Sequence, residues 1–268
     1  MEDPTAYKNS LQPLLAAMDP ISLHEMSSIR LMNRTDKKFV TDIGHLYQML
    51  ELLRDDYFVQ EVEGVRICAY QTIYWDTPDH AFYRMHHNGK TPRRKIRVRT
   101  YLDSDITFLE VKEKNNHGRT HKERIMVAGE DRLLESGAEN FLQEQFRCGL
   151  SAFQPAVCNH FYRITLVNKG KTERLTIDFG VCFENYETGC KEETGNLVII
   201  ELKRDGNVPS PVLQVLRRLR VRPLGFSKYC IGSLLTNPSL KQNRFKMKMT
   251  EISPHKTKTK EETSTRSC

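Results

Sequence analysis

Arg-Arg-Lys-Ile-Arg-Val-Arg-Thr-Tyr, residues 93–101, is the stretch from which the fold can be argued. Cations that alternate with Ile and Val are typical of a β-strand, in which successive side chains point to opposite faces. The four cations at odd positions, from Arg93 to Arg99, then share one face, while Ile96 and Val98 lie on the other. For one strand alone, a solvated polar face is the commoner outcome in an antiparallel sheet. Whether these cations line a site therefore depends on the neighbouring strands.

Other segments repeat the pattern of one charged face and one apolar face. We expect strands at 34–41, 66–76, 93–101, 106–114, 121–127, 157–168, 171–182 and 196–204, and helices at 3–19, 43–54, 79–87, within 130–147, at 211–220 and from about residue 227. The strands follow one another in hairpin order with helices inserted between them, which favours one antiparallel sheet. The predicted fold class is α+β: a closed antiparallel β-barrel or tunnel of about eight strands with helices packed outside.

Charge and composition divide the chain into three parts. Of the net charge of +7, five units belong to Lys241–Cys268, which holds eight Lys or Arg and three Glu. The body of the chain is therefore close to neutral, and any anion site in it must be a local concentration of cations. We expect an N-terminal helical extension at 1–24, a tunnel domain at 25–240 and a basic, disordered tail at 241–268.

The seven cysteines form no Cys-x-x-Cys pair, which argues against a disulfide framework and a zinc site. The first twenty residues lack a basic start followed by an apolar run, and no stretch approaches the roughly 18 apolar residues of a membrane-spanning helix. We therefore expect a cytoplasmic protein.

In a barrel whose apolar face is covered by helices, the charged faces converge on the lumen. Such a lumen suits a polyanion, because Arg donates two hydrogen bonds to phosphate at once and Lys adds a mobile charge. Glu201, and with less support Glu110 and Asp178, could hold Mg²⁺ or Mn²⁺, which take oxygen ligands. For each of these acids, an ion pair with a neighbouring cation is an equally open interpretation.

Other chemistries fail on spacing. Gly170-Lys171-Thr172 resembles the end of a phosphate-binding P-loop, but Thr165 stands where the first glycine is required. No Gly-x-Ser-x-Gly motif is present, and Cys230 fits a packed helix position better than a nucleophile. The remaining signal is the set of charged strands.

Seven short motifs carry a resemblance to a known family. They are Arg-Thr-Asp-Lys-Lys-Phe (34–39), Ile-Arg-Val-Arg-Thr-Tyr (96–101), Leu-Glu-Val-Lys (109–112), Lys-Glu-Arg (122–124), Arg-Leu-Thr-Ile-Asp (174–178), Ile-Glu-Leu-Lys (200–203) and Ser-Lys-Tyr (227–229). In this order they resemble the catalytic domain of the vacuolar transporter chaperone (VTC) polyphosphate polymerases, in the triphosphate tunnel metalloenzyme (CYTH-like) superfamily. The resemblance implies an antiparallel β-tunnel whose basic lumen binds a nucleoside triphosphate and a growing phosphate chain.

The resemblance also implies roles for individual residues. Glu201 would be the metal ligand, for Mn²⁺ or Mg²⁺, and Lys203 shares its face. The phosphate-binding residues would be Lys38, Arg97, Arg99, Lys112, Arg163, Arg174, Lys203 and Lys228, of which Arg97, Arg99, Lys112 and Lys228 would be catalytic. Strand alternation agrees for Lys38, Arg97, Arg99, Lys112, Arg174 and Glu201, and says nothing about Arg163.

The implied activity is metal-dependent transfer of the γ-phosphate of ATP to inorganic polyphosphate. The implied partners are ATP, polyphosphate and a separate membrane protein, with no specific nucleic acid. One alternative is a triphosphatase, which is less favoured because the first strand has Arg34, Asp36 and Lys38 where the hydrolases of the superfamily repeat glutamates. The other alternative is a sensor that binds polyphosphate or nucleotide without catalysis.

Overall fold

A single sheet organises the molecule, as the computed structural model of residues 4–27, 29, 34–117 and 119–252 shows. Within these residues, eight antiparallel strands follow the order β2-β11-β9-β8-β4-β5-β6-β7. Their bounds are β2 Arg34–Asp42, β4 Cys68–Asp76, β5 Arg93–Tyr101, β6 Ile106–Lys114, β7 Thr120–Val127, β8 Gln154–Asn168, β9 Glu173–Asn185 and β11 Leu197–Asp205. Three short strands attach to this path: β1 Asp19–Ile21, β3 Tyr57–Gln60 and β10 Lys191–Glu193. Every strand expected from the sequence is present, whereas β1, β3 and β10 were not expected.

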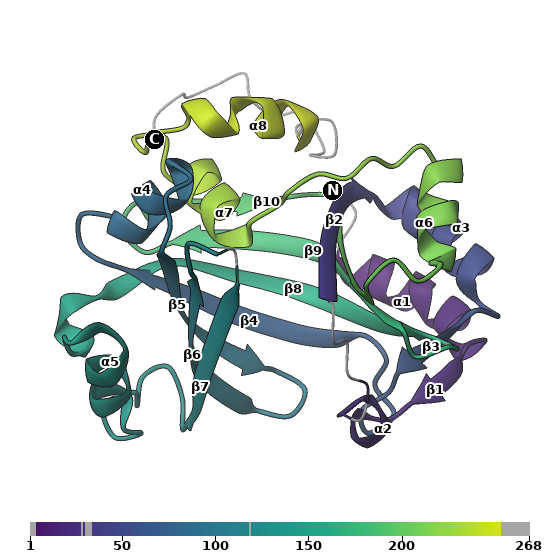
Figure 1. The fold of residues 1–268 in the computed structure, drawn as a ribbon, viewed down its shortest axis with the longest axis horizontal. Helices are drawn as coiled ribbons and strands as arrows, with labels where there is room; N and C mark the ends of the chain where they lie inside the picture. The colour runs from purple at the N-terminus through teal and green to yellow at the C-terminus, as the bar shows by residue number, and fades with distance from the viewer. Residues whose placement is uncertain (1–3, 28, 30–33, 118, 253–268) are drawn as a thin grey trace.

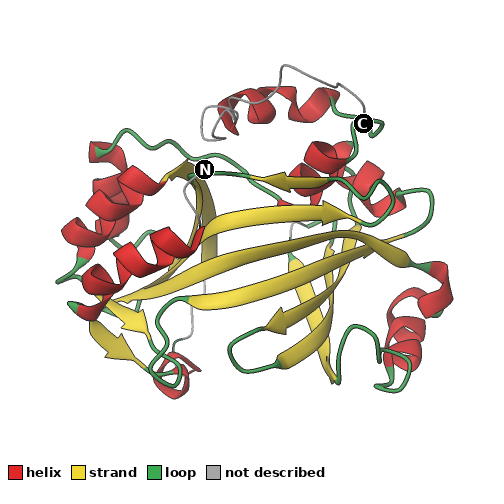
Figure 2. Cartoon of the chain, turned by 180° about the vertical axis from the view of Figure 1, so that it is seen from behind, coloured by secondary structure: helices red, strands yellow, loops and turns green. Residues whose placement is uncertain are grey.

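Most of the helices pack against the apolar side of the sheet (Figures 1 and 2). Their bounds are α1 Pro4–Ala16, α2 Leu23–Ser27, α3 Ile43–Leu53, α4 Ala81–His87, α5 Ala138–Phe146, α6 Pro211–Arg218, α7 Lys228–Thr236 and α8 Lys246–Ile252. Helices α1, α3 and α6 bury Leu11, Leu50 and Leu216 in one core with the apolar residues of β9 and β11. Helices α4, α5 and α7 share a second core with β5 and β6, which includes Ile96 and Val98. The alternation of β5 is therefore confirmed: Arg97 and Arg99 lie on the face opposite Ile96 and Val98 and line the cavity described below.

The sheet does not close by hydrogen bonding, so the expectation of a closed barrel requires correction. Its two ends are β2 and β7, and no ladder joins them in the part of the chain that the structure describes. The outer edge of β2 is occupied instead by the α6–α7 connection, since Leu224 N donates to Lys38 O at 2.8 Å and Phe39 bridges Pro223. The supported description is an α+β fold with a large antiparallel sheet.

The end of the described chain is ordered where the sequence predicts a disordered tail. Residues 243–245 form a 3₁₀ turn that leads into α8, and Phe245 and Ile252 are buried with the second core. Residues 253–268 lie outside the described residues. Among the helices of the described chain, none has the length and apolar character needed to cross a bilayer.

Candidate functional site

A cavity of about 1070 Å³ lies on the charged side of the sheet. Its walls come from β2, β4–β9 and β11, and the first turn of α7 contributes to the lining. All nine residues proposed from the sequence line it: Lys38, Arg97, Arg99, Lys112, Arg163, Arg174, Glu201, Lys203 and Lys228. Arg163, on which strand alternation was silent, is among them. The structure therefore brings residues from six strands and one helix to one place.

Three further cations line the cavity, on strands whose alternation was visible in the sequence. They are Lys95 on β5, together with Lys122 and Arg124 on β7. Among the described residues, the lining then holds eleven Lys or Arg and five carboxylates, the latter being Asp36, Glu63, Asp103, Asp178 and Glu201. Lys95 Nζ donates to Ser227 Oγ at 3.0 Å, at the start of α7. The cavity is strongly positive although the body of the chain is nearly neutral.

Glu110 is an ion-pair partner in this site. Its side chain is only 1% exposed, Arg97 Nε donates to its Oε2 at 2.5 Å, and Lys122 contacts its Oε1. Burial alone would raise the pKa of this carboxyl, but Arg97, Arg99 and Lys122 lower it to about 2. Glu110 therefore stays ionised and holds Arg97 in place, so its expected alternative role as a metal ligand is not supported by these contacts.

Asp178 is a second ion-pair partner, and it holds cations on the opposite wall of the cavity. Arg163 donates to its two oxygens at 2.6 and 2.8 Å, and Lys228 contacts Oδ2. Burial alone would raise the pKa of Asp178, but Arg163 and Lys228 hold that pKa well below its usual range. The Phe161 ring lies beneath both cations, 4.0 Å from Lys228 Nζ and 5.2 Å from Arg163 Cζ. Asp178 thus holds two cations against an aromatic floor.

Three lysines of the cavity share an unusual electrostatic state. Burial, together with neighbouring cations, lowers the pKa values of Lys95, Lys112 and Lys228 to about 8. Burial and the nearby Arg97 and Arg163 likewise lower the pKa of Arg99 to about 10. Crowded, partly desolvated cations gain stability when an anion arrives, because the anion supplies the missing negative charge. These groups therefore favour the binding of a polyanionic ligand.

Comparison with known proteins identifies the family. The family profile of the VTC domain matches residues 33–237. The chain belongs to the VTC domain family. All seven motifs quoted from the sequence fall within this range, so the resemblance drawn from them is confirmed.

Several solved structures are similar to this VTC domain at low identity. A candidate adenylate cyclase from Bacillus halodurans is 12% identical with a TM-score of 0.48, over 73% of this chain and 96% of that chain. A Hippeastrum protein, described as a candidate adenylyl cyclase with a dominant triphosphatase activity, is 13% identical with a TM-score of 0.41, over 78% and 96%. A sequence search of curated proteins finds no match. The family assignment rests on the profile match.

Glu201 is the carboxylate of this VTC domain that best fits a divalent ion. It lines the cavity, and although burial raises its pKa, Lys38, Lys203, Arg163 and Lys112 lower it to about 2. Its ion-pair contact with Lys203 is loose, with Nζ at 3.6 Å from Oε1. No group of three or more potential ligands exists among the described residues. The donor set fits an ion such as Mg²⁺ that takes one protein carboxylate and completes its shell with phosphate oxygens and water.

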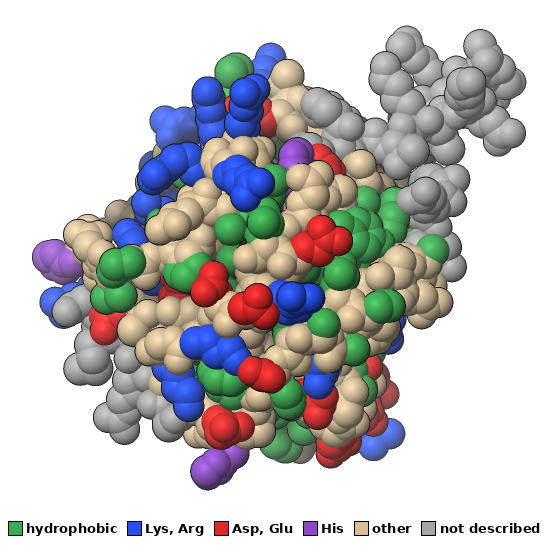
Figure 3. Space-filling view, turned by 90° about the vertical axis from the view of Figure 1, so that its right-hand side faces the viewer, with side chains coloured by type: hydrophobic (Ala, Val, Ile, Leu, Met, Phe, Trp, Pro, Cys, Tyr) green, Lys and Arg blue, Asp and Glu red, His purple; other side chains and the backbone are tan. Residues whose placement is uncertain are grey.

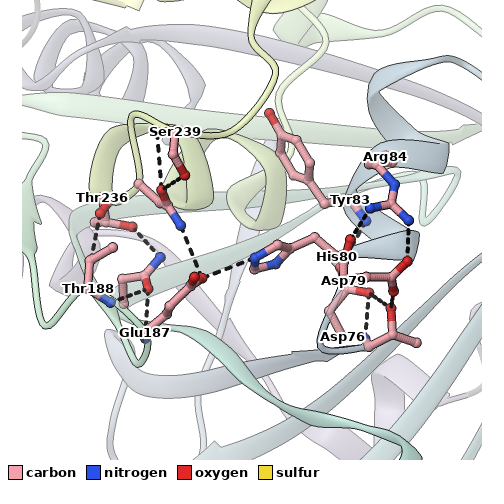
Figure 4. Close-up of polar contacts among 12 residues, drawn as sticks. Asp76, Asp79, His80, Tyr83, Arg84, Glu187, Thr188, Thr236 and Ser239 are labelled. Atoms are coloured by element: carbon pink, nitrogen blue, oxygen red, sulfur yellow. Dashed lines mark hydrogen bonds and ion pairs between the residues drawn. The ribbon is translucent and has the colours of Figure 1, made fainter.

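Contacts at both of its ends fix the position of α7, which carries Lys228. Ser227 caps the helix, accepting from Cys230 N at 3.3 Å. At the other end, Glu187 Oε2 receives Asn237 Nδ2 at 3.2 Å and lies 3.0 Å from His80 Nε2 (Figure 4). Residues before α4, in the β9–β10 turn and after α7 thus meet at one carboxylate. Sequence reasoning missed this arrangement because its members are distant along the chain.

Proposed function

We propose that this protein transfers the γ-phosphate of ATP to the end of an inorganic polyphosphate chain and releases ADP. The observation that carries the proposal is the convergence of eleven cations on one cavity of about 1070 Å³. A donor triphosphate and an acceptor phosphate chain repel each other in water. Cations placed on opposite walls offset that repulsion and allow the two to approach.

The residues of the cavity would act by positioning and charge neutralisation. A terminal oxygen of the chain attacks the γ-phosphorus, and the bond from that phosphorus to the β–γ bridging oxygen breaks, so that ADP leaves with the electron pair. Arg97 and Arg99 would bind the oxygens of the transferred group, on which charge is spread in the transition state. Lys228 and Arg163, held by Asp178 on the opposite wall, would bind the other phosphates.

No protein nucleophile or general base is needed, because the acceptor oxygen is already ionised. Glu201 would hold Mn²⁺ or Mg²⁺, which would neutralise charge on the phosphate oxygens. The carboxylates Glu110 and Asp178 are each paired with two cations. Their contacts favour a role in aligning cations over one in activating water, which supports transfer to a phosphate chain over hydrolysis.

One assay tests the proposal against both alternatives. Purified protein is incubated with γ-labelled ATP and Mn²⁺ or Mg²⁺, and the products are resolved on a gel. Long anionic polymer is the expected product, and an Arg97→Ala/Lys228→Ala double variant prepared in parallel should form none. Orthophosphate without polymer would replace the proposal with a triphosphatase. Unchanged ATP despite measurable binding would replace it with a non-catalytic sensor.

A further inference from the structure

A second basic region lies on the outer side of β2, away from the cavity. We name it the outer groove and define its cations as Lys37, Arg217, Arg220 and Arg222, which line a depression of about 870 Å³. It lies at the end of α6, on the side of the molecule that Figure 3 presents, where Lys and Arg side chains gather at the upper left. The described residues that line the groove include no Asp or Glu. The groove is therefore a separate candidate site for an anion.

The cations of the outer groove are accessible and uncompensated. All four side chains are exposed, and within the described chain none takes part in an ion pair or a side-chain hydrogen bond. Phe39 and Leu216, on the floor of the groove, are 2% and 1% exposed and belong to the core. The chemistry that the groove offers a ligand is therefore mainly positive charge.

Arg220 occupies a backbone conformation that normally favours glycine. Its φ is +58°, and the bonds Val221 N to Leu216 O (2.8 Å) and Arg220 N to Arg217 O (3.0 Å) close the end of α6 around it. Glycine is the usual residue at this position of a helix end, because a side chain at positive φ is strained. An arginine here adds strain to the fold while contributing a cation to the groove.

The outer groove and the cavity are lined by residues that are neighbours in the sequence. Lys37 and Lys38 are successive residues of β2, one lining the groove and the other the cavity. The segment after Arg222 runs along β2 and reaches Ser227 and Lys228, which line the cavity. Basic side chains therefore stand at both ends of one short segment. A long polyanion held in the cavity could meet the groove with its protruding part.

We propose that the outer groove binds inorganic polyphosphate, as a second binding site for the stretch of chain that lies outside the cavity. The inference rests on the proposed function, since it assigns the groove to the same substrate. Arg217, Arg220 and Arg222 donate forked hydrogen bonds to successive phosphates, and Lys37 adds a point charge. A short phosphate fills the cavity alone, whereas a long chain engages both sites and gains affinity from their linkage.

The test compares binding of long-chain polyphosphate and of tripolyphosphate, without nucleotide, to the wild type and a groove variant Arg217→Ala/Arg220→Gly/Arg222→Ala. We expect the Kd for the long chain to rise about tenfold or more, with a weaker salt dependence, and the Kd for tripolyphosphate to change less than about twofold. A matched control, Lys90→Ala/Arg147→Gly/Lys171→Ala, removes three exposed cations elsewhere, including a second arginine at positive φ. It should bind both ligands like the wild type.

Two results would overturn the inference. One is equal long-chain affinity in the groove variant and the wild type. The other is a groove variant that binds long-chain polyphosphate like the wild type but, unlike the wild type, does not float with vesicles containing phosphatidylserine. That result would make the groove a membrane contact. The binding test involves no turnover. A protein that fails to polymerise ATP but shows the expected binding difference would therefore refute the proposed function and leave this inference standing.

The single variant Arg220→Gly separates ligand binding from folding. Glycine relieves the strain at φ +58°, so the thermal midpoint should stay level or rise, while long-chain affinity falls by about twofold or more. Unchanged affinity in this variant, with an unchanged midpoint, would mean that Arg220 has no part in the groove.

Discussion

Arg94 and Arg97 show how one strand assigns different tasks to the same residue type. Arg97 points into the cavity and bonds to Glu110, whose side chain is 1% exposed. Arg94 lies on the other face, where it pairs with the half-exposed Glu113 and its guanidinium lies 4.9 Å from the Phe146 ring centroid. Both are ion-paired arginines, so the difference lies in where the side chains point. Only the first can meet a phosphate in the cavity.

This pair gives a matched test of the cavity. Arg97→Ala should lower kcat/KM for ATP by about 100-fold or more, because it removes a preorganised donor for the transferred phosphate. Arg94→Ala should stay within about threefold of the wild type. Steady-state kinetics of both variants, with circular dichroism to show that each is folded, makes the measurement. Similar losses in the two variants would contradict the assignment of Arg97.

Alternation along strands predicted that Lys38, Arg97, Arg99, Lys112 and Arg174 share the lining of the cavity, because a strand with one apolar core face must present the other residues together. It said nothing about Arg163, and Lys228 was proposed from the resemblance alone. Alternation was also not sufficient to predict the partners of these cations. The bond from Arg163 to Asp178 spans 15 residues and that from Lys228 to Asp178 spans 50. These contacts depend on strand register and on how α7 docks, neither of which is encoded locally. For Glu110 and Asp178 the structure favours the ion-pair interpretation over the metal-ligand one.

At the scale of elements, the close approach of α7 to β9 positions Lys228. Gly232 on α7 faces Phe183 on β9, and a Cβ built on this glycine would lie 2.4 Å from Phe183 Cδ1. Phe183 is 2% exposed and has little room to move. A side chain at position 232 would therefore push the helix away from the sheet. Lys228, one turn earlier, would move with it.

Gly232→Ala is accordingly expected to destabilise the fold by about 1–3 kcal/mol through overpacking and to lower turnover. Urea unfolding and the ATP assay measure the two effects. Adding Phe183→Leu should recover part of both by making room for the methyl group. Ser233→Ala, which removes only a hydroxyl bonded to Tyr229 O, is the control and should behave nearly like the wild type. Full activity in Gly232→Ala would show that the contact does not position Lys228.

The C-terminal elements were the least predictable from sequence. The Lys-rich composition after Lys241 is typical of disorder, yet Phe245 packs edge-on against His87 at 5.6 Å and Arg244 N donates to His87 Nε2 at 3.3 Å. A single buried aromatic among lysines gives no periodic signal. The short strand β3 was missed for a similar reason, since four residues are too few to show alternation.

Phe245→Ala should therefore destabilise the protein by about 2–3 kcal/mol, because it removes a buried ring from the second core. Met247→Ala, at a side chain that is 75% exposed, should change stability by less than about 0.5 kcal/mol. Urea unfolding followed by far-ultraviolet circular dichroism compares the two. Equal stability of the two variants would mean that the segment is not docked on α4 in solution.

At the scale of the whole molecule, the sheet gathers positive charge that the sequence keeps dispersed. Cations from strands at both ends of the sheet line one cavity, and the open edge of β2 is covered by the segment that also joins the outer groove to Lys228. Placing like charges together costs stability in the absence of an anion. The same arrangement makes anion binding favourable, and it makes binding depend on how many lysines are protonated.

Phosphate binding should therefore weaken as pH rises through 8. Lys95, Lys112 and Lys228 have pKa values of about 8, lowered mainly by burial. They attract phosphate when protonated below that pH and lose their charge above it, whereas a free lysine would stay charged to about pH 10.4. We expect the Kd for tripolyphosphate to rise by about tenfold or more between pH 7 and pH 9.5, measured by calorimetry at constant ionic strength. Because an arginine keeps its charge to a higher pH than a lysine in the same surroundings, Lys112→Arg should make the rise shallower. A Kd that is constant from pH 7 to pH 9.5 would show that the three lysines keep ordinary pKa values, and that the cavity does not desolvate them.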